Sequence, residues 1–363
     1  MTIILIFIFV FLILRMLVAC YNYFSTPKLP LYRIGSPYRI SILIPVRNEE
    51  MTIISLLQSI ADQNYSNFEV IILNDNSTDN TLALVEDFAK GNVRFRVING
   101  KPLEQGWTGK NFACWQLAQE ASGQYLLFLD ADVKVSDDLL SSAIYHLRKN
   151  RLCLLSVFSD QQMKTVGEKQ VVPLMNYLLL SLLPVKLIFG HSNPIFAAAC
   201  GQFMLFDNDT YRQYQWHYSV RQEVTEDLKI MKLVKLAGCK GDSLLANGLI
   251  TCRMYNSYTE AVDGFSKNFI APFNDSIPLF ILFLTCVMVG PVLILATLDI
   301  YLILCLCCIV LLTRLMISNL SGQNAWHNAF LHPLQMLSLM HIGCLAVQRK
   351  TTKTRQWKGR VLN

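Results

Sequence analysis

The feature that most constrains this chain is the placement of its apolar residues, which gather near its two ends. Residues 2–19 are apolar except for Thr2 and Arg15, and residues 277–298 and 300–319 form two further apolar stretches. About 18 apolar residues in a helix are enough to cross a membrane. Only 16% of all residues are charged, against about a quarter in a typical soluble domain. We therefore expect one globular domain held between membrane helices.

The N-terminal stretch, residues 1–24, is predicted to be an uncleaved transmembrane anchor. A signal peptide carries its positive charge early and ends at a cleavage site of small residues. Here the charge of Arg15 comes late, and no such site follows it. An anchor therefore fits these residues better than a signal peptide.

Residues 277–347 are predicted to form a C-terminal transmembrane or re-entrant region, followed by a basic tail over residues 348–363. Lys and Arg collect on the cytoplasmic side of membrane proteins, so we expect the tail and the central domain in the cytoplasm. Three crossings after the central domain would separate them, so the segment at about 328–347 is expected to be re-entrant or interfacial. Residues 171–189, interrupted by Pro and Lys, are either a buried helix or an interfacial one.

Charge and cysteine content argue against several other classes of protein. The net charge is +6 and the C-terminal tail is visibly basic, but no nucleic-acid-binding motif accompanies this charge, so no nucleic-acid partner is expected. The 11 cysteines are odd in number and lack CxxC pairs. That pattern argues against a disulfide framework and against a zinc site.

Strand and helix patterns alternate through the central domain, which we predict over residues 38–270. Apolar runs at 40–46, 68–73, 94–98 and 124–129 are typical of buried parallel strands. Helical segments separate them, which predicts an α/β fold with a Rossmann-like, doubly wound sheet. Ligands bind such sheets at the carboxyl ends of the strands. The polar clusters of this domain fall at those ends.

Asp130 and Asp132 flank Ala131 at the end of the fourth predicted strand. Two carboxylates this close repel each other unless a divalent cation lies between them. Oxygen ligands suit Mg²⁺ or Mn²⁺, which usually bridge substrate phosphates as well. A polar turn capped by Asp132 is the plain alternative, and an isolated DxD triplet is a weak signal.

Asp75 and Glu49 follow the second and first predicted strands. A carboxylate at Asp75 suits the N–H of a nucleobase such as uracil, although an Asx turn would also place an Asp there. Glu49 would meet the ribose or the base, or would serve as an acidic residue in the first turn of a helix.

Two further clusters open helices. Gly106, Gly109 and Lys110 form a loop and helix start that suit a diphosphate, because glycines allow close approach and the helix N-terminus favours anions. Glu226 and Asp227 open an amphipathic helix. Acidic residues favour helix N-termini in any case, so these two are either helix-stabilising or include a catalytic base.

Taken in order, these elements resemble glycosyltransferase family 2. The matching pieces are Pro45–Glu50, Asn74–Asp79, Gly109-Lys110, Asp130–Asp132 and Glu226-Asp227. The resemblance implies a GT-A fold, an inverting displacement at the sugar C1, a UDP-sugar or similar donor, and Mg²⁺ or Mn²⁺. The Q-x-x-R-W element of processive members is missing, which argues against a cellulose- or chitin-type polymerase.

Residue by residue, the resemblance assigns expected roles. Asp75 and Glu49 would bind the nucleoside, Asp132 the metal, and Asp130 the donor or the metal. Asp227 would be the general base beside Glu226. The remaining expected donor contacts are Pro45, Arg47, Lys110, Arg253 and Lys267.

Within the family, the arrangement is similar to the membrane-bound branch that glycosylates carotenoids in staphyloxanthin biosynthesis. The shared features include Gly109–Cys114, Arg253-Met254-Tyr255 and Trp357–Arg360. This resemblance implies transfer of glucose from UDP-glucose to the carboxyl group of a C30 carotenoid acid. Hopanoids, glycerolipids, sphingolipids and polyprenyl phosphates are the alternative acceptors, and a membrane ligand-binding protein is the non-enzymatic alternative. A multi-pass protein of the cell membrane, facing the cytoplasm, is expected.

Overall fold

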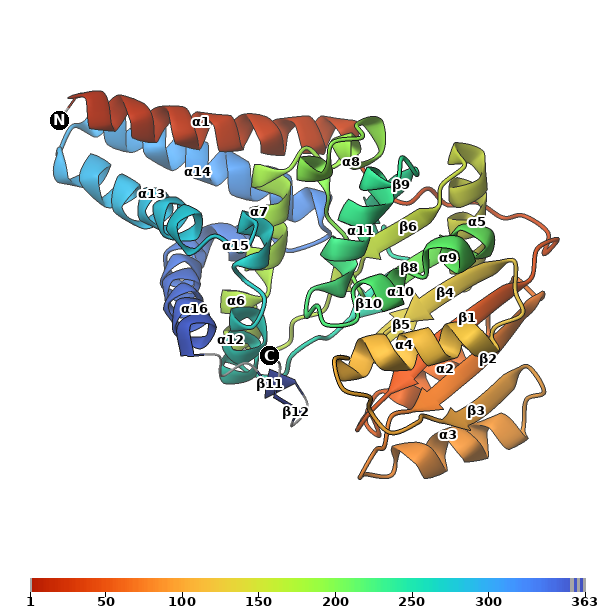
Figure 1. Ribbon diagram of the computed structural model, residues 1–363. Helices are drawn as coiled ribbons and strands as arrows, with labels where there is room; N and C mark the ends of the chain where they lie inside the picture. The colour runs from red at the N-terminus through yellow and green to blue at the C-terminus, as the bar shows by residue number, and fades with distance from the viewer. Residues whose placement is uncertain (1, 353–355, 358–359, 362–363) are drawn as a thin grey trace. The chain divides into compact units, whose positions relative to one another are not determined.

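The computed structural model describes residues 2–352, 356–357 and 360–361. The chain divides into two compact units (Figure 1). The sheet unit comprises Pro27–Gln162 and Lys186–Arg253. The helical unit comprises Met1–Thr26, Met163–Val185 and Met254–Asn363. The sheet unit is therefore discontinuous in sequence, because the chain leaves it at Gln162 and returns at Lys186.

A seven-stranded sheet in the order β3-β2-β1-β4-β8-β6-β9 forms the core of the sheet unit. Its strands are β1 Ile40–Val46, β2 Phe68–Asn74, β3 Phe95–Asn99, β4 Tyr125–Leu129, β6 Leu154–Phe158, β8 Phe203–Asp207 and β9 Gly241–Leu245. The four parallel strands β3, β2, β1 and β4 match the four strands predicted from apolar runs. β1 and β4 are buried on both faces, which explains their continuous hydrophobicity.

Helices connect these strands and cover the sheet (Figure 1). The connecting helices are α2 Ile53–Ala61, α3 Thr81–Lys90, α4 Gly109–Glu120, α5 Leu139–Asn150, α9 Asn208–Tyr214, α10 Trp216–Ser219 and α11 Glu226–Leu236. The chain steps from β1 to β3 in one direction and then crosses back to β4. Right-handed connections therefore place α2 and α3 on one face and α4 on the other, and α2 indeed packs on α3.

The half of the sheet beyond β4 is mixed rather than parallel. β8 runs antiparallel to both β4 and β6, with Leu129 opposite Phe203. The start of β8 therefore lies at the same edge as the end of β4. A small second sheet, β5-β10-β7, joins Val133–Val135, Ile250–Cys252 and Asp160–Gln161 next to that edge.

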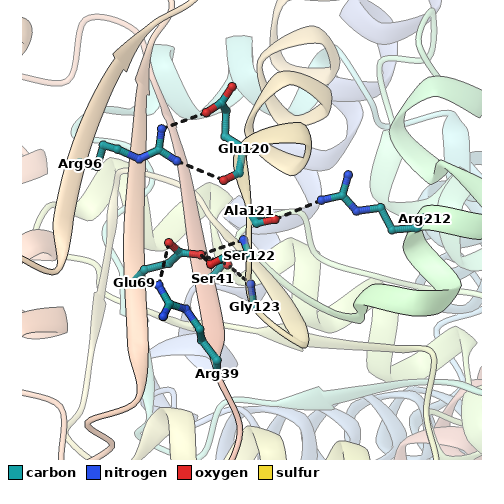
Figure 2. A network of polar contacts seen from close by, with 9 residues as sticks. All are labelled: Arg39, Ser41, Glu69, Arg96, Glu120, Ala121, Ser122, Gly123 and Arg212. Carbon is teal, nitrogen blue, oxygen red and sulfur yellow. Dashed lines mark hydrogen bonds and ion pairs between the residues drawn. The ribbon is translucent and has the colours of Figure 1, made fainter.

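A polar network ties the strands together at the opposite, amino edge of the sheet (Figure 2). Glu69 at the start of β2 accepts hydrogen bonds from Ser41 Oγ (2.5 Å) and from Ser122 N and Oγ (2.9 and 2.7 Å). Gly123 N donates to Ser41 Oγ at 2.8 Å, and a Cβ on Gly123 would lie only 2.6 Å from Ser41 N. The close approach of β1 and the turn before β4 therefore requires glycine.

Three helices of the helical unit are long and apolar enough to cross a membrane, among the residues that the structure describes. They are α1 Thr2–Ser25, α13 Ile277–Ala296 and α14 Ile300–Leu320. They coincide with the three apolar stretches predicted from the sequence, at residues 2–19, 277–298 and 300–319. α16 His332–Thr352, which covers most of the uncertain segment at 328–347, is not among them.

Shorter helices complete the two units. Those of the helical unit are α6 Val166–Val171, α7 Pro173–Leu182, α12 Tyr258–Ser266, η2 Ala271–Phe273 and α15 Ala325–Phe330, and those of the sheet unit are α8 Lys186–Gly190 and η1 Pro194–Phe196. The apolar segment 171–189 is thus broken at Leu183, and α7 packs against α1 and α14 as a buried helix. The strands β11 Gln356–Trp357 and β12 Arg360–Val361 pair near the C-terminus. In the predicted basic tail, Lys353, Arg355 and Lys358 lie outside the described residues.

Candidate active site

Lys110, Asp130 and Glu226 meet at the carboxyl edge of the sheet, although they are distant in sequence. The Lys110 ammonium lies 2.8 Å from Asp130 Oδ1 and 3.0 Å from Glu226 Oε1. Burial alone would lower the pKa of Lys110, but the two carboxylates raise it well above its usual value. Lys110 is therefore a fixed positive charge between two acids that belong to different elements.

The start of α4 holds Lys110 in this position. Thr108 N donates to Arg221 O at 2.8 Å, and the Asn111 side chain donates to Val220 O (2.8 Å) and Glu223 O (3.0 Å). These bonds join the first turn of α4 to the loop that leads into α11. The helix that begins with Lys110 and the helix that begins with Glu226 are consequently anchored to each other.

Asp227 lies beside this cluster and contacts the backbone of Gly201. Its Oδ2 accepts a hydrogen bond from Gly201 N at 2.9 Å, and its Oδ1 accepts one from Leu228 N at 2.7 Å. Burial and the neighbouring charge of Glu226 raise the pKa of Asp227 to about 7. A carboxylate with a pKa near neutrality is well suited to accept a proton in a general-base step.

Asp132 has the environment of a cation ligand. Burial, followed by the charges of Asp130 and Glu49, raises the pKa of Asp132 to about 7. Among the described residues, none donates a hydrogen bond to its buried Oδ1. A buried, unbalanced carboxylate oxygen beside two other acids fits a divalent cation.

The protein supplies few ligands for such a cation. Within the described ranges, no group of three or more His, Cys, Asp or Glu residues is placed to hold a metal by itself. Mg²⁺ usually binds through one or two carboxylates together with water and substrate phosphates. The pair Asp130 and Asp132 therefore fits a metal whose remaining ligands come from a phosphate-bearing substrate.

The loops after β1 and β2 interlock at the same edge and carry Glu49 and Asp75. Arg47 Nη1 donates to Asp75 O at 2.7 Å, and the Asn48 side chain accepts from Thr78 N at 2.8 Å. Asp75 N in turn donates to Val46 O at 2.8 Å. The loop after β1 and the loop after β2 are therefore held together as one surface.

Asn74 and Asp79, on either side of Asp75, accept hydrogen bonds within the loop after β2. Asn74 Oδ1 accepts a hydrogen bond from Ser77 N at 3.1 Å, and Asp79 Oδ1 accepts one from Thr81 N at 3.0 Å. Glu49 N donates to Thr81 Oγ1 at 2.8 Å. Asn74 and Asp79 therefore both stabilise the turns of this loop.

Gly201, Gln202 and Cys252 belong to this site and were missed by sequence reasoning. A Cβ on Gly201 would lie 3.1 Å from Lys110 Nζ and 3.2 Å from Glu226 Oε1. Gln202 O accepts from Asp130 N at 3.2 Å, and the Gln202 side chain donates to Cys252 Sγ at 3.0 Å. The sequence signal for Gly201 and Gln202 was a Gly-Gln pair directly before the apolar run of β8, whereas Cys252 had no comparable signal.

The two predicted cationic contacts fall in different units. Arg253 directly follows β10 in the sheet unit and is half-buried. Lys267 belongs to the helical unit, where its ammonium lies 2.9 Å from Asp263 Oδ2. Their roles toward a diphosphate stay predictions, as do the roles of the other site residues.

Comparison with known families finds a match over nearly half of the chain. The model of the family described as "Glycosyl transferase family 2" matches residues 41–214. This range runs from the second residue of β1 to the end of α9 and so includes β8 and α4, together with Asp75, Lys110, Asp130 and Asp132. Glu226 and Asp227 lie beyond its end.

Two curated relatives match most of the chain. An uncharacterized glycosyltransferase of Haemophilus influenzae is 25% identical over 242 residues, which are 63% of this chain and 69% of the relative. The 4,4'-diaponeurosporenoate glycosyltransferase of Staphylococcus haemolyticus is 23% identical over 260 residues, which are 69% of this chain and 66% of the relative. The chain therefore spans about two thirds of the length of these relatives.

One solved structure shares the fold over nearly the whole chain. The mannosyltransferase PcManGT from Pyrobaculum calidifontis, solved in complex with GDP-Man and Mn²⁺, has a TM-score of 0.60 and 14% sequence identity. The similarity covers 97% of this chain and 99% of that one. The predicted GT-A fold with apolar helices near both ends is thereby confirmed.

Proposed function

We propose that this protein transfers a sugar from a nucleoside diphosphate to a hydrophobic acceptor in the membrane, a proposal supported by the match of residues 41–214 to the model of glycosyltransferase family 2. The observation that carries the proposal is the convergence of Lys110, Asp130, Glu226 and Asp227 around Gly201. In this proposal the arrangement would combine a diphosphate-binding cation, an acidic metal ligand and a base at one edge of the sheet.

The donor half of the site is proposed to lie along the carboxyl ends of β1, β2 and β4. Asp75 and Glu49 would bind the nucleoside, and Pro45 and Arg47 would shape the wall beside it. Lys110 would contact the diphosphate, since an ammonium is attracted to phosphate oxygens. Asp130 and Asp132 would hold Mg²⁺ or Mn²⁺, which when bound offsets the charge that develops on the departing diphosphate.

Glu226 and Asp227, at the start of α11, have different roles in this proposal. Glu226 forms the ion pair with Lys110 and so fixes the position of that cation. Asp227 has no ion pair among the described residues and has a pKa raised to about 7. Asp227 is therefore proposed to accept the proton of an acceptor hydroxyl as the oxygen attacks the sugar C1. An acceptor that is already a carboxylate would need this base less.

The membrane helices suggest the class of acceptor. A lipid acceptor stays in the bilayer, so an enzyme anchored by three apolar helices would meet it without extracting it. The relative from Staphylococcus haemolyticus is a 4,4'-diaponeurosporenoate glycosyltransferase, which supports a carotenoid acid as acceptor. Glucose from UDP-glucose is proposed as the sugar from the resemblance in sequence alone. A relative from Nostoc sp., 30% identical over 125 residues that are 34% of this chain and 26% of the relative, is a beta-monoglucosyldiacylglycerol synthase, which supports a glycerolipid as the alternative.

The topology that follows from this proposal places the sheet unit in the cytoplasm. Three crossings by α1, α13 and α14 bring residue 26, residue 276 and residue 321 to one side of the membrane. Arg349 and Lys350 at the end of α16 lie on that same side if α16 does not cross. Because basic residues favour the cytoplasmic side, the protein is proposed to be a multi-pass membrane protein with its site in the cytoplasm.

Membranes that contain the full chain provide the test of the enzyme class. With UDP-glucose and a lipid extract, UDP release should require Mg²⁺ or Mn²⁺ and should disappear on chelation. Asp132→Asn should raise the metal concentration needed for activity, whereas Asp62→Asn, at an exposed helix end, should not. No release of nucleotide with any nucleotide-sugar and any lipid tested would refute the proposal.

Expression of the chain in cells that make a C30 carotenoid acid tests the acceptor. A glucosyl ester of the pigment should appear by mass spectrometry, and its amount should fall with Asp132→Asn. An unchanged pigment together with a glycosylated glycerolipid would reject the carotenoid and support the alternative.

A further inference from the structure

Two arginines are buried inside the helical unit, among helices apolar enough to cross a membrane. Arg15 of α1 is 4% exposed and Arg314 of α14 is 1% exposed. Charged side chains within membrane segments are costly and usually pair with a group of opposite charge or line a functional site. The partners of these two guanidinium groups therefore show whether their charge is balanced.

Arg15 contacts a hydroxyl and aromatic rings. Its Nε and Nη2 donate to Ser181 Oγ on α7 at 3.2 and 2.7 Å. Its guanidinium carbon lies 4.6 Å from the centre of the Tyr177 ring and 5.7 Å from the rings of Phe11 and Phe283. All of these partners are uncharged.

Arg314 has the same kind of surroundings. Its Nε donates to His332 Nδ1 at 2.8 Å, and its guanidinium carbon lies 3.6 Å from the centre of the Tyr177 ring. Its Nη2 is buried, and among the described residues it has no hydrogen-bond acceptor. A buried guanidinium nitrogen without an acceptor is unfavourable, because it has lost its hydrogen bonds to water and has formed none within the protein.

The two positive charges are close together and lack a counter-charge. Both guanidinium carbons lie over Tyr177, at 4.6 and 3.6 Å from the ring centre, so their separation is at most about 8 Å. Within the part of the chain that the structure describes, no carboxylate forms an ion pair with Arg15 or Arg314. Cation–π contacts with one ring do not neutralise two charges. An anion is therefore the missing component of this cluster.

We propose that Arg15 and Arg314 bind the phosphate of an anionic membrane lipid between α1, α7 and α14. Guanidinium groups bind phosphate oxygens through paired, charge-assisted hydrogen bonds. The buried Nη2 of Arg314 is a donor that could form such a bond. The anion comes from a lipid because the cluster lies among helices whose exposed side chains are apolar. The proposal concerns the helical unit alone and stands whether or not the chain transfers a sugar.

Lipid retention by the purified full chain provides the test. The protein is equilibrated in nanodiscs of phosphatidylcholine alone, or doped with phosphatidylglycerol or with oleic acid, and lipids that remain bound after transfer to detergent are counted by native mass spectrometry. Phosphatidylglycerol should be retained in preference to phosphatidylcholine. Arg15→Gln and Arg314→Gln should each weaken this retention by about tenfold or more, since each removes charge-assisted hydrogen bonds.

Matched variants separate lipid binding from general effects of charge and folding. Arg33→Gln removes one positive charge from a side chain that is 81% exposed, and it should leave retention unchanged. Arg314→Lys keeps the charge but loses the paired donors, so it should fold and retain phosphatidylglycerol with intermediate affinity.

Three results would overturn the proposal. Equal retention of phosphatidylcholine and phosphatidylglycerol would show that the headgroup charge is not recognised. Retention of oleic acid without phosphatidylglycerol would assign the anion to a carboxylate. Inorganic phosphate that displaces phosphatidylglycerol at equal concentration would show that the cluster binds a free anion rather than a lipid.

Discussion

Substitution of Gly201 by alanine tests whether the residues gathered around it act together. Gly201 N donates to Asp227 Oδ2 at 2.9 Å, and alanine keeps this N–H. The added Cβ would lie 3.1 Å from Lys110 Nζ and 3.2 Å from Glu226 Oε1. The perturbation is therefore purely steric, and it acts on the ion pair between Lys110 and Glu226.

The magnitude follows from these distances. Ordinary contacts of a Cβ begin near 3.4 Å, so Lys110 and Glu226 must each move by a few tenths of an ångström. A displacement of about 1 Å in an active site can cost about a hundredfold in rate, so the smaller shift should cost roughly tenfold. Overpacking costs about 1–3 kcal/mol of stability, and the lower end applies because the end of a lysine side chain can shift.

The assay is nucleotide release at saturating donor, together with thermal unfolding of the same preparation. Gly35→Ala is the matched control, because a Cβ at Gly35 meets nothing within 4 Å. We expect Gly201→Ala to fold and turn over slowly, and Gly35→Ala to behave as the unmodified chain. A folded Gly201→Ala protein with unchanged turnover would refute the coupling of these residues in catalysis.

Three further substitutions address the charges of the sheet unit. Lys110→Met leaves the carboxylates of Asp130 and Glu226 without their cation, so the Kd for UDP measured by calorimetry should rise by about tenfold or more, because a charged hydrogen bond contributes about 1.5–3 kcal/mol. Asp227 acts as a base only when deprotonated, and its pKa is raised to about 7, so kcat with a hydroxyl acceptor should rise about tenfold from pH 6 to pH 8. Asp227→Asn should abolish turnover while UDP binding persists. A flat pH profile of the unmodified chain would contradict the role of Asp227 as the base. Although burial alone would raise the pKa of Glu69, its hydrogen bonds hold that pKa below the usual 4.5. Glu69→Ala should therefore lower the free energy of unfolding by about 1–3 kcal/mol at neutral pH, and this difference should shrink as the pH falls through the depressed pKa. Equal urea midpoints of the two proteins at neutral pH would contradict this prediction.

The parallel half of the sheet was predictable because its signals are local. A strand buried on both faces is apolar along its whole length, as in β1 and β4, and the polar residues that follow it mark its end. Parallel strands bring all of these ends to one edge. Asp75, Lys110 and Asp130 were therefore found from short windows of sequence, without knowledge of which strands pair.

The antiparallel strand β8 was not predictable in the same way, and it changed the content of the candidate site. An antiparallel strand brings its beginning, rather than its end, to the carboxyl edge of its neighbours. This places Gly201 and Gln202 beside Asp130, although they precede an apolar run instead of following one. The direction in which a strand pairs depends on contacts with distant residues, which no local pattern encodes.

The sequence alone determined that this chain has apolar helices near its ends and an α/β sheet between them, because hydrophobic length and period are properties of single segments. Only the tertiary structure decided which charges meet. Lys110 lies between Asp130 and Glu226, and Arg15 and Arg314 share the ring of Tyr177. The energy of a charge depends on its burial and on its neighbours in space, and both are set by packing between segments far apart in the sequence.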